Sequence, residues 1–197
     1  VPRLETFVLA SNKNTTKGVL LIGTDPIKEN NLTQLKSKVI KGNYFQNNEE
    51  AILIAEGLAE RLEIDVNDTI VLFGQGFHDV MAGGKYKIKG ILHLASPDMN
   101  NTFVYLPLES TQYLLSADNR LTSISLGIDS PENLTSINKT LKSNTPKTYE
   151  VMTWQEMMPE IANHIKADGF TFYIFSGILY IIIGFGFFGT ILMMTVE

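Results

Sequence analysis

An uninterrupted apolar run near the C-terminal end constrains this chain more than any other feature. The run, Phe170–Val196, contains no Asp, Glu, Lys, Arg, Asn or Gln. As one helix it would extend about 40 Å, which exceeds the roughly 30 Å of hydrocarbon in a bilayer. A buried helix of a soluble domain is the alternative, but soluble helices of this length carry polar side chains on some face. The C-terminal position excludes a signal peptide. The run therefore predicts a transmembrane helix over residues 170–196.

The residues before this run have the composition of an ordinary soluble domain with a small acidic excess. All 16 Lys and Arg precede the span, and so do all of the 21 Asp and Glu except Glu197. A negative balance disfavours nucleic acid as a partner, and also docking on anionic lipid by charge alone. The sequence has no cysteine, which excludes disulfides, thiolate metal sites and a cysteine nucleophile.

Both ends of the sequence indicate a piece of a longer polypeptide. The chain opens at Val1 without Met, already in strand-like sequence, and it stops one residue after the apolar run. We therefore expect further residues on both sides.

The segments before the span predict strands that pair locally, with helices between them. Expected strands cover Leu4–Ala10, Val19–Gly23, Ala51–Ala55, Thr69–Phe73, Lys85–Leu94, Phe103–Leu106, Leu121–Ile128 and Thr148–Val151. Expected helices cover Asn30–Ile40, Glu56–Leu62, Leu108–Leu115, Pro131–Lys142 and Thr153–Lys166, and a turn is expected at Ser96–Asn101. This order predicts an α+β fold with a mixed sheet, built as one domain or two subdomains, followed by the C-terminal transmembrane helix.

Three parts follow from this division: a domain over 1–152, an amphipathic juxtamembrane helix over 153–169, and the span over 170–196. Thr153 and Glu156 have the spacing of a capping box at the start of the juxtamembrane helix. Its expected apolar stripe consists of Trp154, Met157, Met158, Ile161 and Ile165. Gly169 either breaks the helix or is carried through it, and in the second case a continuous rod joins the domain to the membrane.

A glycine-rich loop is expected over Gly74–Gly84, between two strands of a hairpin. Exposed apolar side chains on a mobile hairpin predict a contact with a substrate or partner. The expected contact residues are Gln75, Gly76, Phe77, His78, Val80 and Met81. The alternative is a loop that folds back onto its own domain.

Small residues inside the span predict packing against other transmembrane helices. Gly184–Gly189 matches the G-x-G-x-x-G nucleotide fingerprint, but that motif needs a preceding strand and an amphipathic helix, not an apolar run. Close helix contacts use small residues instead. The expected packing residues are Gly177, Gly184, Gly186 and Thr190. Chance placement of glycine is the alternative.

Catalytic motifs do not emerge from the sequence. It has no G-x-x-x-x-G-K-[ST] motif, so the chain is not itself expected to be an ATPase. His78, His93 and His164 lack metal-ligand spacing, and no serine has a nucleophile elbow. His78 beside Asp79 is either a site or part of a solvated loop. We therefore predict no enzyme activity, catalytic residue, cofactor or metal.

Several segments, in order, resemble one membrane protein family. They are GNYF (42–45), AILIAEGLAERLEIDVNDTIVLF (51–73), YKIKGIL (86–92), FVYLPLESTQYLL (103–115) and LTSISLGI (121–128). With VPRLETF (1–7), GVLLIGTDP (18–26) and GQGFHDVMAGG (74–84), they resemble the extracytoplasmic domain of FtsX/MacB/LolCE-type ABC transporter permeases. Thr24 replaces the usual Ile, and Asn67 replaces the Gly before Asp68. Asn tolerates a left-handed backbone, so the turn should survive.

The resemblance implies a place and a mechanism. It implies a first span before Val1, two more after Glu197, and residues 1–169 in the periplasm or outside the cell, on the bacterial inner (cytoplasmic) membrane. It also implies an ABC ATPase subunit, a second permease copy or a related permease, and an envelope substrate or periplasmic partner. ATP-driven motion would then serve lipoprotein release, export of a peptide or small molecule, or control of a cell-wall enzyme.

Two other classes of function remain open from the residues alone. A single-span membrane-anchored sensor or ligand-binding domain shares the juxtamembrane helix and the span. A membrane-anchored enzyme is the third class, and it would depend on His78 and Asp79.

Overall fold

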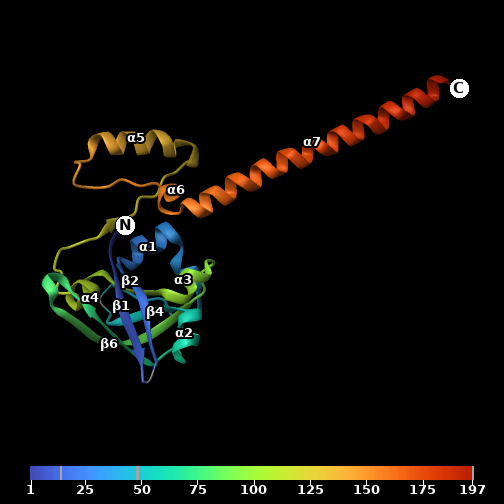
Figure 1. Cartoon of the computed structure of the whole chain (residues 1–197). Helices are drawn as coiled ribbons and strands as arrows, with labels where there is room; N and C mark the ends of the chain where they lie inside the picture. The colour runs from blue at the N-terminus through green and yellow to red at the C-terminus, as the bar shows by residue number, and fades with distance from the viewer. Residues whose placement is uncertain (14, 48, 197) are drawn as a thin grey trace. The chain divides into compact units, whose positions relative to one another are not determined.

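The chain folds into two compact units, Val1–Gly127 and Ile128–Glu197 (Figure 1). The computed structural model describes residues 1–13, 15–47 and 49–196, apart from the side chains of 160, 161, 164–171 and 196. The α+β prediction is confirmed: the first unit combines a mixed sheet with short helices, and the second ends in a long apolar helix.

The described strands of the first unit all belong to one sheet. They are β1 Pro2–Asn12, β2 Thr15–Thr24, β3 Val39–Gly42, β4 Ala51–Ala55, β5 Thr69–Gln75, β6 Met81–Leu92, β7 Phe103–Pro107 and β8 Ser123–Ile124. The pairing order β2-β7-β4-β6-β5-β1 closes on itself, because β1 also pairs with β2. The pairs β2–β7 and β4–β6 are parallel, and the other pairs are antiparallel. Closure leaves few free edges in the main ring, while β3 and β8 attach outside it.

Helices of the first unit connect and cover the strands. They are α1 Pro26–Thr33, η1 Leu35–Lys38, α2 Glu56–Leu62, η2 Phe77–Asp79, α3 Pro97–Thr102 and α4 Leu108–Leu114. Strand β4 is buried on both faces, as its apolar run predicts, because Ile52 and Ile54 enter one core cluster while Leu53 and Ala55 enter a second. The predicted bounds of β4 and α2 are confirmed.

A helix forms in the region predicted as Asn30–Ile40, but its predicted bounds are wrong. Asp25 caps α1 by accepting hydrogen bonds from the amides of Ile27 (2.9 Å) and Lys28 (3.0 Å), so the helix starts at Pro26. It ends at Thr33 because Gln34 takes a left-handed conformation (φ 54°). A stripe at helical spacing is therefore divided among a helix, a 3-10 turn and β3.

Three other local predictions also differ from the structure. Ser96–Asn101, expected as a turn, is instead mostly helical, because α3 starts at Pro97, directly after its N-cap residue Ser96. Leu121–Ile128, expected as a strand, forms a strand only over Ser123–Ile124, where it pairs with Arg3 and Pro2 at the beginning of β1. Thr148–Val151 forms no strand in the described chain, where it has turn and irregular structure. Alternation alone therefore does not make a strand; hydrogen bonds to a partner strand are also needed.

The second unit is helical. It contains η3 Pro131–Asn133, α5 Leu134–Asn144, α6 Trp154–Met157 and α7 Pro159–Val196. The capping box is confirmed: the Glu156 amide donates to the Thr153 hydroxyl (3.3 Å), and the Thr153 amide donates to the Glu156 carboxylate (2.6 Å). A single helix over Thr153–Lys166 is wrong, because Met158 leaves the helical region (φ −128°, ψ 66°) just before Pro159.

Helix α7 carries Gly169 through without a break. Within it, Phe172–Thr195 is long and apolar enough to cross a membrane, with a mean hydropathy of 2.1 in its most apolar window. The side chains of Ile161, His164 and Ile165, named in the sequence predictions, lie outside the described set.

Candidate functional site

The predicted contact loop is a short hairpin tip, narrower than the Gly74–Gly84 loop expected from sequence. Strand β5 continues to Gln75 and β6 already begins at Met81, which pairs with it. The Gly76 amide donates to the carbonyl of Val80 (2.7 Å), which closes the turn. Gly83 and Gly84 are therefore strand residues. The tip is Gln75–Met81, which contains all six predicted contact residues.

The two sides of the tip face different surroundings. Phe77 packs against the core, its amide donates to the Leu115 carbonyl (2.7 Å), and the Arg120 guanidinium lies 4.1 Å above its ring. Val80 and Met81 point outward, and Met81 is 90% exposed. Phe77 thus anchors the tip to its own domain, while Val80 and Met81 are exposed; their contact with a substrate or partner stays a prediction.

The backbone of the tip is strained at two residues. His78 and Asp79 both have left-handed backbones (φ 56° and 60°), which non-glycine residues rarely adopt. The Gln75 side-chain amide donates to the Asp79 carboxylate across the tip. The ring of His78 lies edge-on to Phe77, with centroids 4.0 Å apart. His78 and Asp79 thus hold the shape of the tip, and the geometry gives neither of them a catalytic partner.

Exposed apolar residues on neighbouring strands extend the tip into a larger surface. Phe7 and Leu9 project outward from β1, with Val8 and Ala10 buried on the opposite face. Leu9 pairs with Phe73 of β5, and Phe73 lies diagonal to Met81 on the outward face of β6. We call Phe7, Leu9, Phe73, Val80 and Met81 the outer apolar face. Phe7, Leu9 and Phe73 were not identified from the sequence. Apolar residues occur at both odd and even positions of Leu4–Ala10, which indicates a strand with apolar side chains on both faces.

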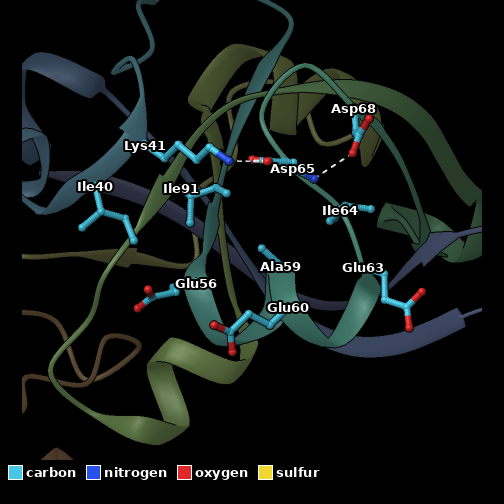
Figure 2. A pocket seen from close by; sticks show the side chains of 10 residues that line it. All are labelled: Ile40, Lys41, Glu56, Ala59, Glu60, Glu63, Ile64, Asp65, Asp68 and Ile91. Carbon is cyan, nitrogen blue, oxygen red and sulfur yellow. Dashed lines mark hydrogen bonds and ion pairs between the residues drawn. The ribbon is translucent and has the colours of Figure 1, made fainter.

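A groove of about 380 Å³ lies beside α2 (Figure 2). Its rim carries acidic side chains from α2 and the following turn: Glu56, Glu60, Glu63, Asp65 and Asp68. Lys41 pairs with Asp65, and Asp68 accepts a hydrogen bond from the Asp65 amide (2.7 Å). The turn depends on Asn67, whose left-handed backbone (φ 75°) matches the sequence prediction. In the described part of the chain no three His, Cys, Asp or Glu are arranged to hold a metal ion. The two aspartates thus serve the turn.

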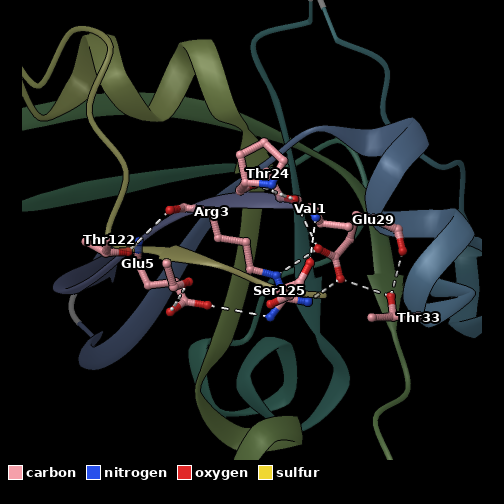
Figure 3. Close-up of polar contacts among 10 residues, drawn as sticks. Val1, Arg3, Glu5, Thr24, Glu29, Thr33, Thr122 and Ser125 are labelled. Atoms are coloured by element: carbon pink, nitrogen blue, oxygen red, sulfur yellow. Dashed lines mark hydrogen bonds and ion pairs between the residues drawn. The ribbon is translucent and has the colours of Figure 1, made fainter. Parts of the chain in front are cut away.

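A buried ion pair fixes the N-terminal strand to α1 (Figure 3). The Arg3 guanidinium donates two hydrogen bonds to Glu29, at 2.9 and 2.7 Å. The hydroxyls of Thr24 and Thr33 also donate to this carboxylate, each at 3.0 Å. Glu29 is only 1% exposed, and sequence reasoning did not single it out. A glutamate inside an otherwise polar helix gives no sign of burial until the partner strand is placed.

The small residues of α7 do not share one face of the helix. Gly184 follows Gly177 by seven residues, which is close to two turns, whereas Gly186 follows Gly177 by nine residues, or about two and a half turns. Gly177 and Gly184 therefore lie on one side, and Gly186 with Thr190 on the other. Thr190 donates its hydroxyl to the Gly186 carbonyl (2.9 Å). Among the described residues, no atom outside the adjoining helix backbone would lie within 4 Å of a Cβ added to any of these three glycines.

The fold and these surfaces define a class: an α+β domain with a closed mixed sheet, in a chain that ends in a helix apolar enough to cross a membrane. The family model of the MacB-like periplasmic core domain matches residues 1–144, and the chain belongs to this family. It is thus a periplasmic-type domain of a MacB/FtsX-type ABC transporter permease, as the sequence resemblance implied.

A solved structure supports the fold. The extracellular domain of the noncanonic ABC-type transporter YknZ from Gram-positive bacteria matches with a TM-score of 0.55 and 17% sequence identity. The match covers 78% of this chain and 80% of that chain. A sequence identity this low supports a similar fold only. Among curated proteins, none matches this chain.

Proposed function

We propose that this chain supplies the extracytoplasmic domain and a following span of a permease in the bacterial cytoplasmic membrane. Its ATPase would be a separate subunit, and a second permease copy or a related permease would complete the transporter. ATP-driven movement of the spans would be passed to the domain outside, which acts on an envelope substrate. Lipoprotein release and export of a peptide or small molecule are the substrate classes to be tested.

The continuity of α7 is the observation that carries this proposal. The helix runs from Pro159 to Val196 without a break, through Asp168 and Gly169. At its start, the capped helix α6 is tied to α5 by an ion pair between Lys142 and Glu156 (2.7 Å). Since an uninterrupted helix bends little, a displacement of the span would move the helical segment outside the membrane with it.

The outer apolar face is the proposed contact surface for the substrate or for a periplasmic partner. Strands β1, β5 and β6 carry all of its residues except Val80, so the strand residues keep fixed spacing while the domain moves. A photoreactive amino acid at Met81 should form cross-links to the partner in membranes of the native host. The matched position is Ile27 on α1, which is also apolar and exposed (67%) but does not belong to the outer apolar face. Equal cross-linking at both positions would refute this contact surface.

Isolation of the assembled complex tests the class of protein. The full-length protein that contains this chain is tagged, extracted from native membranes in mild detergent, and its partners are identified by mass spectrometry. An ABC ATPase among them, in stoichiometric amount, is the expected result. Recovery with a kinase or other signalling protein, and no ATPase, would instead establish the single-span sensor.

An insertion between Asp168 and Gly169 tests the transmission of movement. Seven Gly-Ser residues would introduce a flexible joint, and seven helix-forming residues would add close to two turns while keeping the rod and its phase. We expect both variants to insert in the membrane and bind the ATPase, but only the flexible insert should abolish transport. Full transport with the flexible insert would show that α7 is only an anchor.

A further inference from the structure

A second cavity lies away from the outer apolar face. It has a volume of about 310 Å³ and is formed by the segment before β4, by β6 and by α4. Its walls combine two tyrosines, Tyr86 and Tyr113, with three carboxylates, Glu49, Glu50 and Glu109. Asn47 and Ser110 complete the lining, which includes no Lys, Arg or His. The combination of aromatic rings and acids without a base sets it apart from the groove beside α2, where Lys41 is present.

Tyr86 is the buried polar group of this cavity. It is only 7% exposed, yet it lines the open space, and its hydroxyl has no hydrogen-bond partner among the described residues. Its ring lies over Gly84, where an added Cβ would come within 2.8 Å of the ring carbon Cε2. Burial, followed by the nearby Glu50 and Tyr113, raises the pKa of the Tyr86 phenol to about 12. The phenol is therefore neutral at ordinary pH, and its oxygen can accept a hydrogen bond.

The carboxylates of the cavity differ in what they already bind. Glu49 pairs with Lys89 and accepts a hydrogen bond from the Gln46 amide (3.1 Å). Glu50 and Glu109 form no ion pair with any Lys, Arg or His whose side chain the structure describes. Two carboxylates without an ion-pair partner among the described side chains thus face this cavity. Their charge favours a ligand that donates hydrogen bonds and carries positive charge.

We propose that this cavity binds a primary ammonium group, carried either by a lysine side chain or by a free alkylamine. An ammonium has three donors and no acceptor, which matches the Tyr86 oxygen and the carboxylates of Glu50 and Glu109. The ring of Tyr113 offers its face to the same cation. This site does not depend on the proposed transport function, because binding can be measured on the chain alone.

The test uses the full chain in detergent micelles, labelled with fluorotyrosine and followed by fluorine NMR. The probes are N-acetyl-lysine amide and butylammonium, and the neutral control is N-acetyl-norleucine amide. Tyr→Phe variants assign the resonances of Tyr86 and Tyr113. We expect both resonances to shift saturably with either cation, with a dissociation constant on the order of millimolar, because exposed ion pairs and cation–π contacts are individually weak.

Three variants decide the outcome. Replacing Glu50 and Glu109 by Gln should weaken binding by about fivefold for each carboxylate, the upper limit for an exposed pair. Lys89→Met should strengthen binding, because it releases Glu49, and a gain cannot come from misfolding. Glu60→Gln removes a carboxylate that is also exposed but lies outside the cavity, and it should leave the affinity unchanged.

Several results would overturn the proposal: no saturable shift, equal shifts with the norleucine amide, or unchanged affinity in the Glu50 and Glu109 variant. The two cationic probes separate the sources of the ligand. Equal affinity for the lysine amide and for butylammonium would show that an alkylammonium group alone is sufficient for binding. Tighter binding of the lysine amide would support a peptide, whose backbone adds contacts.

Discussion

Replacing Glu29 by Gln tests the buried ion pair that fixes β1 to α1. The change keeps the volume of the side chain but removes its charge and turns one acceptor oxygen into an amide donor. In the native chain, this carboxylate accepts hydrogen bonds from Arg3, Thr24 and Thr33. The amide would direct N–H groups toward a guanidinium or hydroxyl, and the charge of Arg3 would remain without its partner.

The expected cost follows from the burial of each partner. Removing one partner of a fully buried pair costs about 3–5 kcal/mol, because the other charge is left uncompensated. Glu29 is almost fully buried, but the side chain of Arg3 keeps 19% of its exposure and also lies 3.6 Å from Glu5. Water and Glu5 compensate part of the lost attraction. We therefore expect the free energy of unfolding of the first unit to fall by about 2–4 kcal/mol.

Hydrogen exchange of the buried β4 amides measures this change in the full chain. Ile52, Leu53 and Ile54 are fully buried, so their slowest exchange reports on unfolding of the unit. Glu5→Gln is the matched control, because it removes a second, more exposed carboxylate beside Arg3 and should cost less than about 1 kcal/mol. The double variant Arg3→Met, Glu29→Leu should recover much of the loss. The reasoning is refuted if Glu29→Gln destabilises the unit no more than Glu5→Gln does. It is also refuted if the double variant costs as much as Arg3→Met and Glu29→Leu, made singly, cost together.

Three further predictions concern acid, alkali and the span. The hydrogen bond from Lys89 lowers the pKa of Glu49 in the folded chain. The ionised Glu49 therefore contributes to stability above about pH 4.3, and this contribution is lost as the pH falls through the pKa of Glu49 in the folded state. Lys89→Met should remove this part of the acid dependence of the free energy of unfolding, measured by denaturant titration. Burial raises the pKa of the Tyr105 phenol in the folded chain. The neutral phenol therefore contributes fully to stability below about pH 10, and this contribution is lost as the pH rises through the pKa of Tyr105 in the folded state. Tyr105→Phe should reduce the fall in the free energy of unfolding at alkaline pH, and an unchanged fall would contradict this prediction. In the span, Gly184→Leu should weaken association between chains in nanodiscs, measured by energy transfer, and Ile183→Leu should leave it unchanged. Equal effects of the two changes would argue against packing through Gly184.

Local sequence predicted those elements whose ends are marked by residues of their own segment. Ala51–Ala55 and Glu56–Leu62 were placed correctly because an apolar run passes directly into a helix with Leu58 and Leu62 on its inner face. The capping box at Thr153 and the left-handed Asn67 belong to the same group. In each case the determining contacts lie within a few residues.

Predictions failed where the outcome depended on a partner distant in the sequence. The alternating segment Leu121–Ile128 became a strand only over the two residues that pair with the beginning of β1. The glycine-rich loop was shorter than expected because β6 extends along the whole of β5. The burial of Glu29 also depends on a distant residue, Arg3.

The apolar run itself determined that this chain ends in a helix able to cross a membrane, because hydrocarbon length and the absence of charge are properties of the segment alone. Sequence also determined the α+β class, through local periodicity. Only the tertiary structure decided that the strands close into a ring, that Phe77 holds the tip while Met81 faces outward, and that Tyr86 lines one cavity with Glu50 and Glu109. These features depend on pairings and burial between residues far apart in the chain, which no local pattern specifies.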